Sequence, residues 1–359
     1  MTAALPLEAL FCVGFDGNAV PDHVRSGLAA GLGGVILFRR NVECPEQLCA
    51  LTGALHAASA RPLLVGVDQE GGRVLRLPPP FLPAPPAAAL GATDDPSLTQ
   101  RLACAVGREL RAAGITWNLA PVLDVQTNPA NTVIGDRAYG SDPERVTRHG
   151  LAAIRGFTEA GILATAKHFP GHGDTAADSH ATLPESQQSA ARWRAVEFVP
   201  FRRAIQVDVP LVLVAHLLSP SLDPRLPTSL SRRTISGILR EELGFTGVVV
   251  SDDLEMAAIA ARMDVGEAAV CFLEAGGDLV LICHEAARQQ VAIAAVRAAV
   301  RSGRLPEARV AESIARIGRC AARLSGPLGP DPEMLRGAIG DRSRGSLLAE
   351  LAAITRDVS

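Results

Sequence analysis

The run Ala164-Thr165-Ala166-Lys167-His168-Phe169-Pro170-Gly171-His172-Gly173 decides the fold of this 359-residue chain. It begins as an apolar segment of strand length, and the proline and glycines after Phe169 predict a loop. Lys167 is the only lysine in the sequence, and it stands beside two histidines. So many titratable groups at the end of one predicted strand indicate a functional site there.

Seven further apolar runs of similar length resemble this one. Most are continuously apolar, which is typical of parallel strands buried on both faces. Stretches of helical period lie between them, and strands that alternate with helices predict an α/β fold, a (β/α)8 barrel of the TIM type. A doubly wound sheet with two extra strands is the alternative. The eight predicted strands cover Leu10 to Phe15, Gly34 to Phe38, Leu63 to Asp68, Trp117 to Asp124, Ala164 to Phe169, Leu211 to His216, Val248 to Asp252 and Asp278 to Cys283.

We expect one catalytic barrel over residues 1–325 and a C-terminal helical tail over 326–359, packed on the barrel or extending from it. Helices are predicted between the strands, and two more follow the eighth strand. The proline-rich stretch from Pro78 to Pro96 is expected to be a surface excursion without a fold of its own. The loop from Gly171 to about Ser186 is expected to be a lid. The predicted helices are Gln100 to Ala113, Pro143 to Ala160, Ala190 to Gln206, Arg232 to Leu243, Gly266 to Ala275, Glu285 to Arg301 and Glu307 to Leu324.

The composition is that of a soluble enzyme. The formal net charge is −3 and 48% of the residues are hydrophobic, which gives no indication of a nucleic-acid partner. Seven scattered cysteines without a CxxC pair predict free thiols in a reducing compartment. The N-terminus lacks the basic segment of a signal peptide, and no apolar stretch is long enough to cross a membrane. We therefore expect a cytoplasmic monomer.

Charged or imidazole side chains end five of the eight predicted strands. They are expected at the carboxyl ends of the strands, where barrels carry their catalytic groups. Only one of the two aspartates at the seventh strand is expected to face the pocket, because neighbouring strand residues point to opposite sides. These residues are Asp68, Asp124, Lys167 with His168, His216, and Asp252 with Asp253.

Three kinds of site are compatible with the histidine-rich loop. Its histidines and aspartates are possible metal ligands, but no HxxxH helix or HExxH sequence is present. Gly171 and Gly173 lack the Walker pattern of a phosphate loop. In the third interpretation, Asp178 orients His180 as a general acid and base, and Asp252 or Asp253 is a nucleophile. We favour the third interpretation, which requires neither metal nor cofactor.

Four ordered segments give the chain a resemblance to a known family, the β-N-acetylhexosaminidases of glycoside hydrolase family 3. The resemblance extends over nearly the whole chain and also includes residues 33–38 and 214–216. The segments are Val67 to Val74 (VDQEGGRV), Ile134 to Arg137 (IGDR), Lys167 to His180 (KHFPGHGDTAADSH) and Ser251 to Met256 (SDDLEM).

The resemblance implies a retaining β-N-acetylglucosaminidase that acts on terminal β-linked N-acetylglucosamine in muropeptide fragments of peptidoglycan. It implies that Asp252 is the nucleophile, His180 the general acid and base, and Asp178 its partner. The residues implied to bind the sugar are Asp68, Arg76, Arg137, Lys167 and His168, of which Arg76 matches by its offset from Asp68. His172 and Asp174 are expected to shape the loop.

The implied chemistry suits these residue types. A retaining glycosidase pairs a nucleophilic carboxylate with an acid/base group, and an imidazole can exchange these two protonation states near neutral pH. A β-glucosidase and a phosphorylase of the same family are alternatives, as is a barrel without activity that binds muropeptides. Family 3 β-glucosidases generally take their acid/base residue from a second domain, for which this chain is too short.

Overall fold

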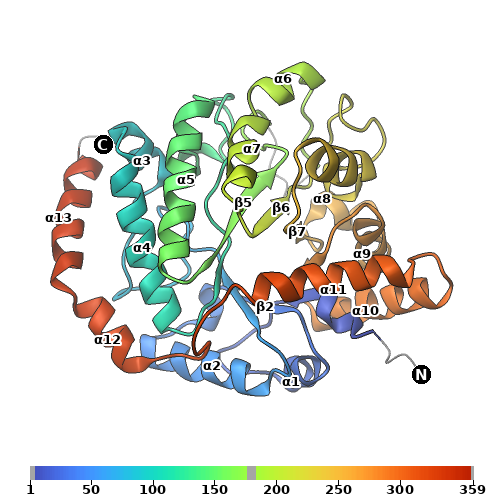
Figure 1. Ribbon diagram of the computed structural model, residues 1–359, viewed down its shortest axis with the longest axis horizontal. Helices are drawn as coiled ribbons and strands as arrows, with labels where there is room; N and C mark the ends of the chain where they lie inside the picture. Colours follow the sequence, from blue (N-terminus) through green and yellow to red (C-terminus); the bar gives the residue numbers. More distant parts are fainter. Residues whose placement is uncertain (1–4, 176–182, 357–359) are drawn as a thin grey trace.

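Eight parallel strands close into a barrel in chain order, β1 to β8, at the centre of the molecule (Figure 1). This is a computed structural model, and it describes residues 5–175 and 183–356. The barrel confirms the predicted fold, and each predicted strand overlaps an observed one. The strands are β1 Phe11–Val13, β2 Gly34–Leu37, β3 Leu64–Val67, β4 Trp117–Asn118, β5 Leu163–Phe169, β6 Leu211–Val214, β7 Val248–Asp253 and β8 Leu279–Ile282.

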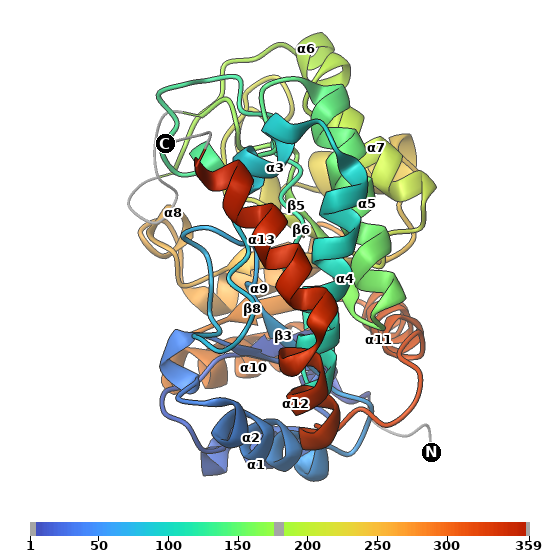
Figure 2. The same cartoon turned by 90° about the vertical axis from the view of Figure 1, so that its left-hand side faces the viewer.

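Helices surround the barrel on its outer side (Figures 1 and 2). The α-helices in the described residues are α1 Asp22–Ala29, α2 Pro45–Ala58, α3 Ala87–Thr93, α4 Pro96–Ala112, α5 Pro143–Glu159, α6 Ala190–Ala195, α7 Phe198–Gln206, α8 Ala257–Ala260, α9 Val265–Glu274, α10 Ala286–Arg301, α11 Glu307–Ala321, α12 Pro332–Gly340 and α13 Arg342–Arg356. Short 3-10 helices are η1 Leu7–Leu10, η2 Arg39–Asn41, η3 Gly135–Arg137 and η4 Thr228–Leu230, and η5 Arg233–Glu242 is a π-helix where the sequence predicts an α-helix.

The strands are buried along almost their entire length. All seven residues of β5 are buried, including Lys167 and His168. Gly66 of β3 makes room inside the barrel, because a Cβ at this position would lie 2.6 Å from the Trp117 ring. The Trp117 indole donates a hydrogen bond of 2.6 Å to Thr165, so its one polar atom is satisfied inside the core.

One predicted helix, Ala190 to Gln206, is two helices. The chain leaves the helical conformation at Val196 (φ −128°, ψ −70°) between α6 and α7. Pro200 explains the break, because a proline inside a helix clashes with the carbonyl group four residues earlier, which here is that of Val196. Restarting at Phe198 puts Pro200 in the first turn of α7, where proline is tolerated.

The proline-rich stretch 78–96 is more than a surface excursion, so that expectation is wrong. It contains α3, and Phe81 and Leu82 are each only 2% exposed. This burial is difficult to predict from the sequence, because the prolines interrupt the regular spacing by which an apolar face is recognised. The stretch therefore belongs to the folded domain, in which α3 packs against α4 and α5.

The chain after Ser325 folds back onto the barrel. α12 packs against α4 and α2, and α13 runs along the outer side of α3 and α4 (Figure 2). Leu347 and Leu351 of α13 are buried. Within residues 5–175 and 183–356, no helix combines the length and the apolar character needed to span a membrane.

Candidate active site

A cavity of about 940 Å³ opens at the carboxyl ends of the strands. It brings together six residues predicted from the sequence, and they come from β5, β7 and the loops after β3 and β4. Closure of the barrel produces this gathering, because all eight parallel strands end at the same rim. The six residues that line the cavity are Asp68, Arg76, Arg137, Lys167, His168 and Asp252.

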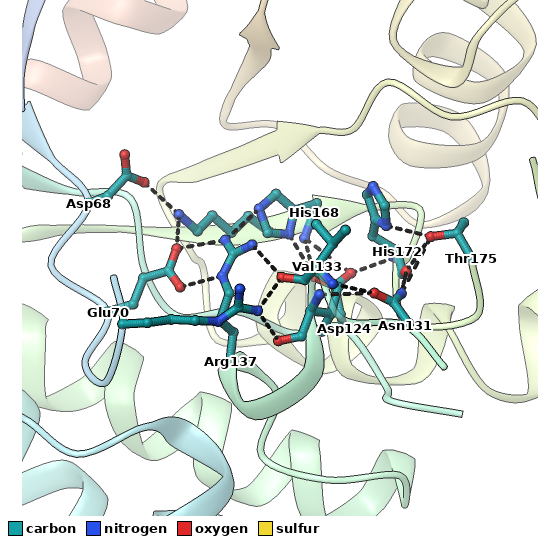
Figure 3. Close-up of polar contacts among 12 residues, drawn as sticks. Asp68, Glu70, Asp124, Asn131, Val133, Arg137, His168, His172 and Thr175 are labelled. Atoms are coloured by element: carbon teal, nitrogen blue, oxygen red, sulfur yellow. Dashed lines mark hydrogen bonds and ion pairs between the residues drawn. The ribbon is translucent and has the colours of Figure 1, made fainter. Parts of the chain in front are cut away.

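Lys167 is held between two carboxylates. Its Nζ lies 2.7 Å from Asp68 Oδ1 and 2.5 Å from Glu70 Oε1, and its side chain is 3% exposed. Figure 3 shows the two acids, Asp68 and Glu70, on the same side of the site as Arg137. Asp68 also forms an ion pair of 3.7 Å with Arg76. A buried ammonium group is stable only with such partners. Lys167 thus neutralises the pair of acids and fixes the Asp68 carboxylate at the cavity wall.

Arg137 links Glu70 to His168. Its guanidinium donates two parallel hydrogen bonds of 2.8 Å to the Glu70 carboxylate. A third, of 3.2 Å, goes to His168 Nε2. Burial opposes ionisation of Glu70, but Lys167 and Arg137 together hold its pKa well below the usual range. Glu70 is therefore an anion that aligns two cations, a geometry favoured by the guanidinium fork.

Asp124 orients the histidine segment from beneath. It is fully buried, and its Oδ2 lies 2.6 Å from His168 Nδ1. The backbone N–H of His172 donates to Asp124 Oδ1 at 2.6 Å. Since His168 Nε2 accepts from Arg137, the ring proton is assigned to Nδ1, which donates to Asp124. Burial raises the pKa of Asp124, but His168 and the His172 N–H outweigh it and lower that pKa.

Asp252 and Asp253 both line the cavity, so the expectation that only one of them faces it is wrong, but they differ in their partners. The Asp253 carboxylate accepts from the backbone N–H groups of Glu255 (3.1 Å) and Cys283 (3.3 Å) and pairs with His284 at 3.3 Å. Burial raises the pKa of Asp252, but interactions with His216 and His168 and the Asp253 N–H outweigh it, so the pKa lies below its usual value. Asp252 is an ionised carboxylate facing the cavity.

His216 supports the same region from β6. It is fully buried, with Nδ1 2.7 Å from Ser229 Oγ and Nε2 3.0 Å from the Asp253 carbonyl oxygen. Both ring nitrogens are therefore bonded within the protein. Its proximity to Asp252 gives it an electrostatic effect on the cavity as well.

Two buried polar atoms belong to residues of the cavity wall and are unpaired within the described residues. Within the described residues, neither Arg76 Nε nor His172 Nε2 has a hydrogen-bond partner. Both residues line the cavity. Thr175 Oγ1 lies 2.7 Å from His172 Nδ1. The other ring nitrogen, Nε2, therefore points away from Thr175. A polar ligand would satisfy both atoms.

The loop after β5 carries the remaining predicted residues. Asp178 and His180 lie outside the described residues. On one side of them, Asp174 accepts hydrogen bonds of 3.1 Å from Ser186 Oγ and Gln188 Nε2, which agrees with a role in shaping the loop. On the other side, Ser186 N–H donates to the Leu218 carbonyl oxygen at 2.9 Å.

The prediction of the site from sequence misses Glu70 and the role of Asp124. The sequence marks Asp124 as the end of a strand, but not as the partner of His168. Glu70 lies within the conspicuous VDQEGGRV segment, and that acidic residue beside Asp68 is the only local signal for it. No metal cluster is predicted, and within the described residues no group of three or more His, Cys, Asp or Glu side chains could hold a metal ion.

Comparison with known proteins gives consistent matches. The family model of the glycosyl hydrolase family 3 N-terminal domain matches residues 13–320. A protein named beta-hexosaminidase from Alkalilimnicola ehrlichii is 42% identical over 279 residues, covering 76% of this chain and 80% of its own. One of that name from Thiobacillus denitrificans is 42% identical over 275 residues, covering 75% and 76%.

Solved structures match over still more of the chain. A family 3 beta-N-acetylglucosaminidase from a Paenibacillus species superposes with a TM-score of 0.92 at 41% identity, covering 99% of this chain and 69% of its own. A beta-glucoside phosphorylase superposes with a TM-score of 0.88 at 25% identity, covering 98% of this chain and 65% of its own.

Proposed function

This chain belongs to glycosyl hydrolase family 3 and is a glycoside hydrolase, and from that membership we propose that it releases terminal non-reducing β-linked N-acetylglucosamine. We propose muropeptide fragments of peptidoglycan as its natural substrates. The relatives named beta-hexosaminidase and the superposed beta-N-acetylglucosaminidase support the sugar. The proposed class of aglycone rests on the sequence resemblance.

One observation carries this proposal. The ionised Asp252 faces the same cavity as Asp68, Lys167 and Arg137, and these three are already fixed by ion pairs. A nucleophile needs a substrate held in one orientation, and fixed charged groups at strand ends provide this by hydrogen bonds to sugar hydroxyls. The cavity therefore combines a reactive carboxylate with a preorganised binding wall.

We propose a two-step retaining mechanism. Asp252 attacks the anomeric carbon while the imidazolium of His180 protonates the leaving oxygen, which gives a covalent glycosyl-enzyme. Neutral His180 then takes a proton from water, and that water displaces Asp252 and releases the sugar. Asp178 orients His180. The low pKa of Asp252 keeps the nucleophile ionised while the histidine is still protonated.

In this proposal, the binding residues contact different parts of the sugar. Asp68, held by Lys167, accepts hydrogen bonds from ring hydroxyls, and Arg76 Nε donates one. Arg137 and His168 are coupled by their 3.2 Å hydrogen bond, so they present one fixed polar surface. We propose that the buried His172 Nε2 also contributes, because it lines the cavity without a protein partner among the described residues.

The test is release of 4-nitrophenol from 4-nitrophenyl β-N-acetylglucosaminide by the wild type and by Asp252→Asn. We expect turnover by the wild type and a loss of about a thousandfold or more in the variant, because the carboxylate is the attacking group. The matching β-glucoside serves as the substrate control. Proton NMR of the first product formed must show the β-anomer. The α-anomer would exclude the retaining mechanism, and no turnover of either substrate would favour a binding protein without activity.

A phosphorylase is the second candidate, favoured by the superposition with a beta-glucoside phosphorylase at a TM-score of 0.88. An imidazole acid/base does not repel an anionic nucleophile as a carboxylate would, so phosphate could replace water in the second step. The assay is repeated with and without inorganic phosphate. Formation of a sugar 1-phosphate would assign the phosphorylase, and turnover independent of phosphate would assign the hydrolase.

We further propose that the protein acts as a monomer in the cytoplasm. All seven cysteines are free in the structure, which supports a reducing compartment. Light scattering should give a mass close to 37.5 kDa. A mass twice as large would exclude the monomer.

A further inference from the structure

The segment 78–86 packs against a turn that runs from Glu70 to Arg76, and it fixes the position of this turn. Gly72 N–H donates a hydrogen bond of 2.9 Å to the Ala84 carbonyl oxygen. Gly71 has a φ of +118°, and a Cβ there would lie 2.3 Å from the Pro85 carbonyl oxygen. Only glycine permits so close an approach of two backbones. Movement of this segment would therefore move the turn as well.

The same turn leads directly into the cavity. Glu70 immediately precedes the two glycines and holds Lys167 and Arg137 by its carboxylate. At its other end, the backbone N–H of Arg76 donates to Gln69 Oε1 at 2.9 Å. The turn thus carries one predicted sugar-binding residue, Arg76, and through Glu70 it contacts two more, Arg137 and Lys167.

On its far side, the segment is held by the C-terminal tail. Leu82 N–H donates to Glu109 Oε2 of α4 at 2.7 Å. Glu109 Oε1 lies 2.9 Å from Arg344 Nε of α13, and Arg344 Nη2 donates to the Pro80 carbonyl oxygen. The Glu109 side chain is 4% exposed, and this burial raises its pKa, whereas the Leu82 N–H and Arg344 both favour its charged form. One arginine of the tail therefore touches both the segment and the acid that anchors it.

The tail otherwise covers α4 incompletely. A second cavity, of about 770 Å³, lies between α4 and α13 and includes Glu109 and Arg344 in its wall. A separate ion pair, Arg101 to Glu350 at 2.7 Å, joins the same two helices. Among the described residues, the Arg101 guanidinium is bonded to Glu350 and not to the segment 78–86. One of the two ion pairs therefore only attaches the tail to α4, whereas the other also supports the turn.

We propose that Arg344 is a positioning residue for the active site. Through Glu109 and Pro80 it fixes the segment 78–86 against Gly71 and Gly72, and so fixes Glu70 and Arg76 at the cavity. The inference rests on the proposed function of that cavity. The tail and the proline-rich stretch take no part in the catalytic mechanism. Through Arg344 they share a role in substrate binding.

The test compares Arg344→Ala with the control Arg101→Ala, which removes the other ion pair between the tail and α4. We expect the KM of Arg344→Ala for the N-acetylglucosaminide to rise about tenfold while kcat stays within about twofold, because Asp252 and His180 are untouched. Arg101→Ala should keep both constants within about twofold. Arg344→Lys should recover part of the KM, because it restores the charge but not the planar fork.

Amide hydrogen exchange provides a readout that does not depend on substrate. The Gly72 amide should exchange about tenfold faster in Arg344→Ala than in Arg101→Ala, because its acceptor Ala84 is no longer held. Glu109→Gln removes the ion pair with little change of shape and replaces Arg344→Ala if that variant does not fold. The inference would be overturned if both alanine variants lowered the melting temperature equally and left KM and the hydrogen exchange of the Gly72 amide unchanged. A wild type without turnover would refute the proposed function instead, and the exchange comparison would still decide this inference.

Discussion

Asp124 is fully buried beneath the start of the loop after β5, and among the described residues its carboxylate accepts hydrogen bonds from His168 and His172 alone. The side chain therefore sets both the ring orientation of His168 and the path of the chain into that loop. An aspartate that orients a histidine in this way contributes to function without touching substrate.

We expect Asp124→Asn to lower kcat/KM about 10- to 100-fold, because a hydrogen bond to a charged group is worth about 1.5–3 kcal/mol. The amide cannot accept from the His168 ring and from both backbone N–H groups as the carboxylate does. Steady-state kinetics with the aryl N-acetylglucosaminide measures the effect. A matching melting temperature shows that the variant is folded, and an unchanged kcat/KM would contradict the assigned role.

Individual residues of the site are predictable where the residue type and its place at a strand end coincide. Asp68, Lys167, His168 and Asp252 satisfy both conditions. Glu70 does not, because its partner Arg137 lies 67 residues further along the chain. Asp124 is likewise 44 residues from His168. Such pairs form only when strands and loops are brought together, and no local pattern records them.

Helix α7 (Phe198–Gln206) places a buried acid beneath the loop after β5. Glu197, just before it, is fully buried and packs against Gly171, where an added Cβ would lie 2.8 Å from the Glu197 Cβ. Its charged neighbours are Arg192 of α6, at 3.1 Å, and Asp174 of the loop. Burial is the main cause that raises the pKa of Glu197 to about 7, and Arg192 offsets part of it.

This acid should make stability depend on pH. The folded state binds the proton more tightly than the unfolded state, whose pKa is about 4.5, so stability falls as pH rises from about 4.5 through about 7. We expect the unfolding free energy of the wild type to drop by about 2–3 kcal/mol more than that of Glu197→Gln between about pH 5 and about pH 8. Urea unfolding at the two pH values measures this. Parallel pH profiles would show that Glu197 does not titrate in this range.

The strands are easier to predict than the helices. Continuous apolar runs such as Leu211 to His216 are bounded by turn residues and have few other interpretations. The helix pattern over Ala190 to Gln206 conceals a break, because Pro200 fits its period. Prediction over the stretch 78–96 fails for a related reason, since its apolar residues are buried without any regular spacing.

The two ends of the barrel have different tasks. The carboxyl ends of the strands carry the cavity, whereas Asp278, just before β8, lies at the amino end. There it accepts hydrogen bonds from Ser313 Oγ (2.7 Å) and Val249 N–H (2.9 Å). It is fully buried and also pairs with three arginines, Arg240, Arg309 and Arg316. This cluster closes the amino end of the barrel, at the opposite end from the cavity.

We expect Asp278→Asn to reduce the unfolding free energy by about 3–5 kcal/mol, because it removes a fully buried anion that three partly buried arginines share. The KM and kcat of the folded fraction should not change, in contrast to Asp124→Asn. Denaturant unfolding and kinetics on the same preparation separate the two effects. A change in KM would mean that the amino end of the barrel influences substrate binding.

The alternation of eight strands with helices predicts the barrel, whereas nothing in the sequence predicts the course of the tail. Residues 326–359 are predicted to be helical, and α12 and α13 agree with this. Their docking depends on single long-range contacts such as Arg344 with Glu109, which helical periodicity cannot specify. The division into a catalytic barrel over residues 1–325 and a tail over 326–359 stays a prediction.

The burial of Lys167 also gives this protein a built-in probe of unfolding. It is the only lysine in the chain and is 2% exposed in the middle of β5. A lysine-specific protease should therefore leave the native protein intact and cut the unfolded chain once, into residues 1–167 and 168–359. Under native conditions, the rate of that single cut reports how often β5 opens, and binding of the sugar should slow it.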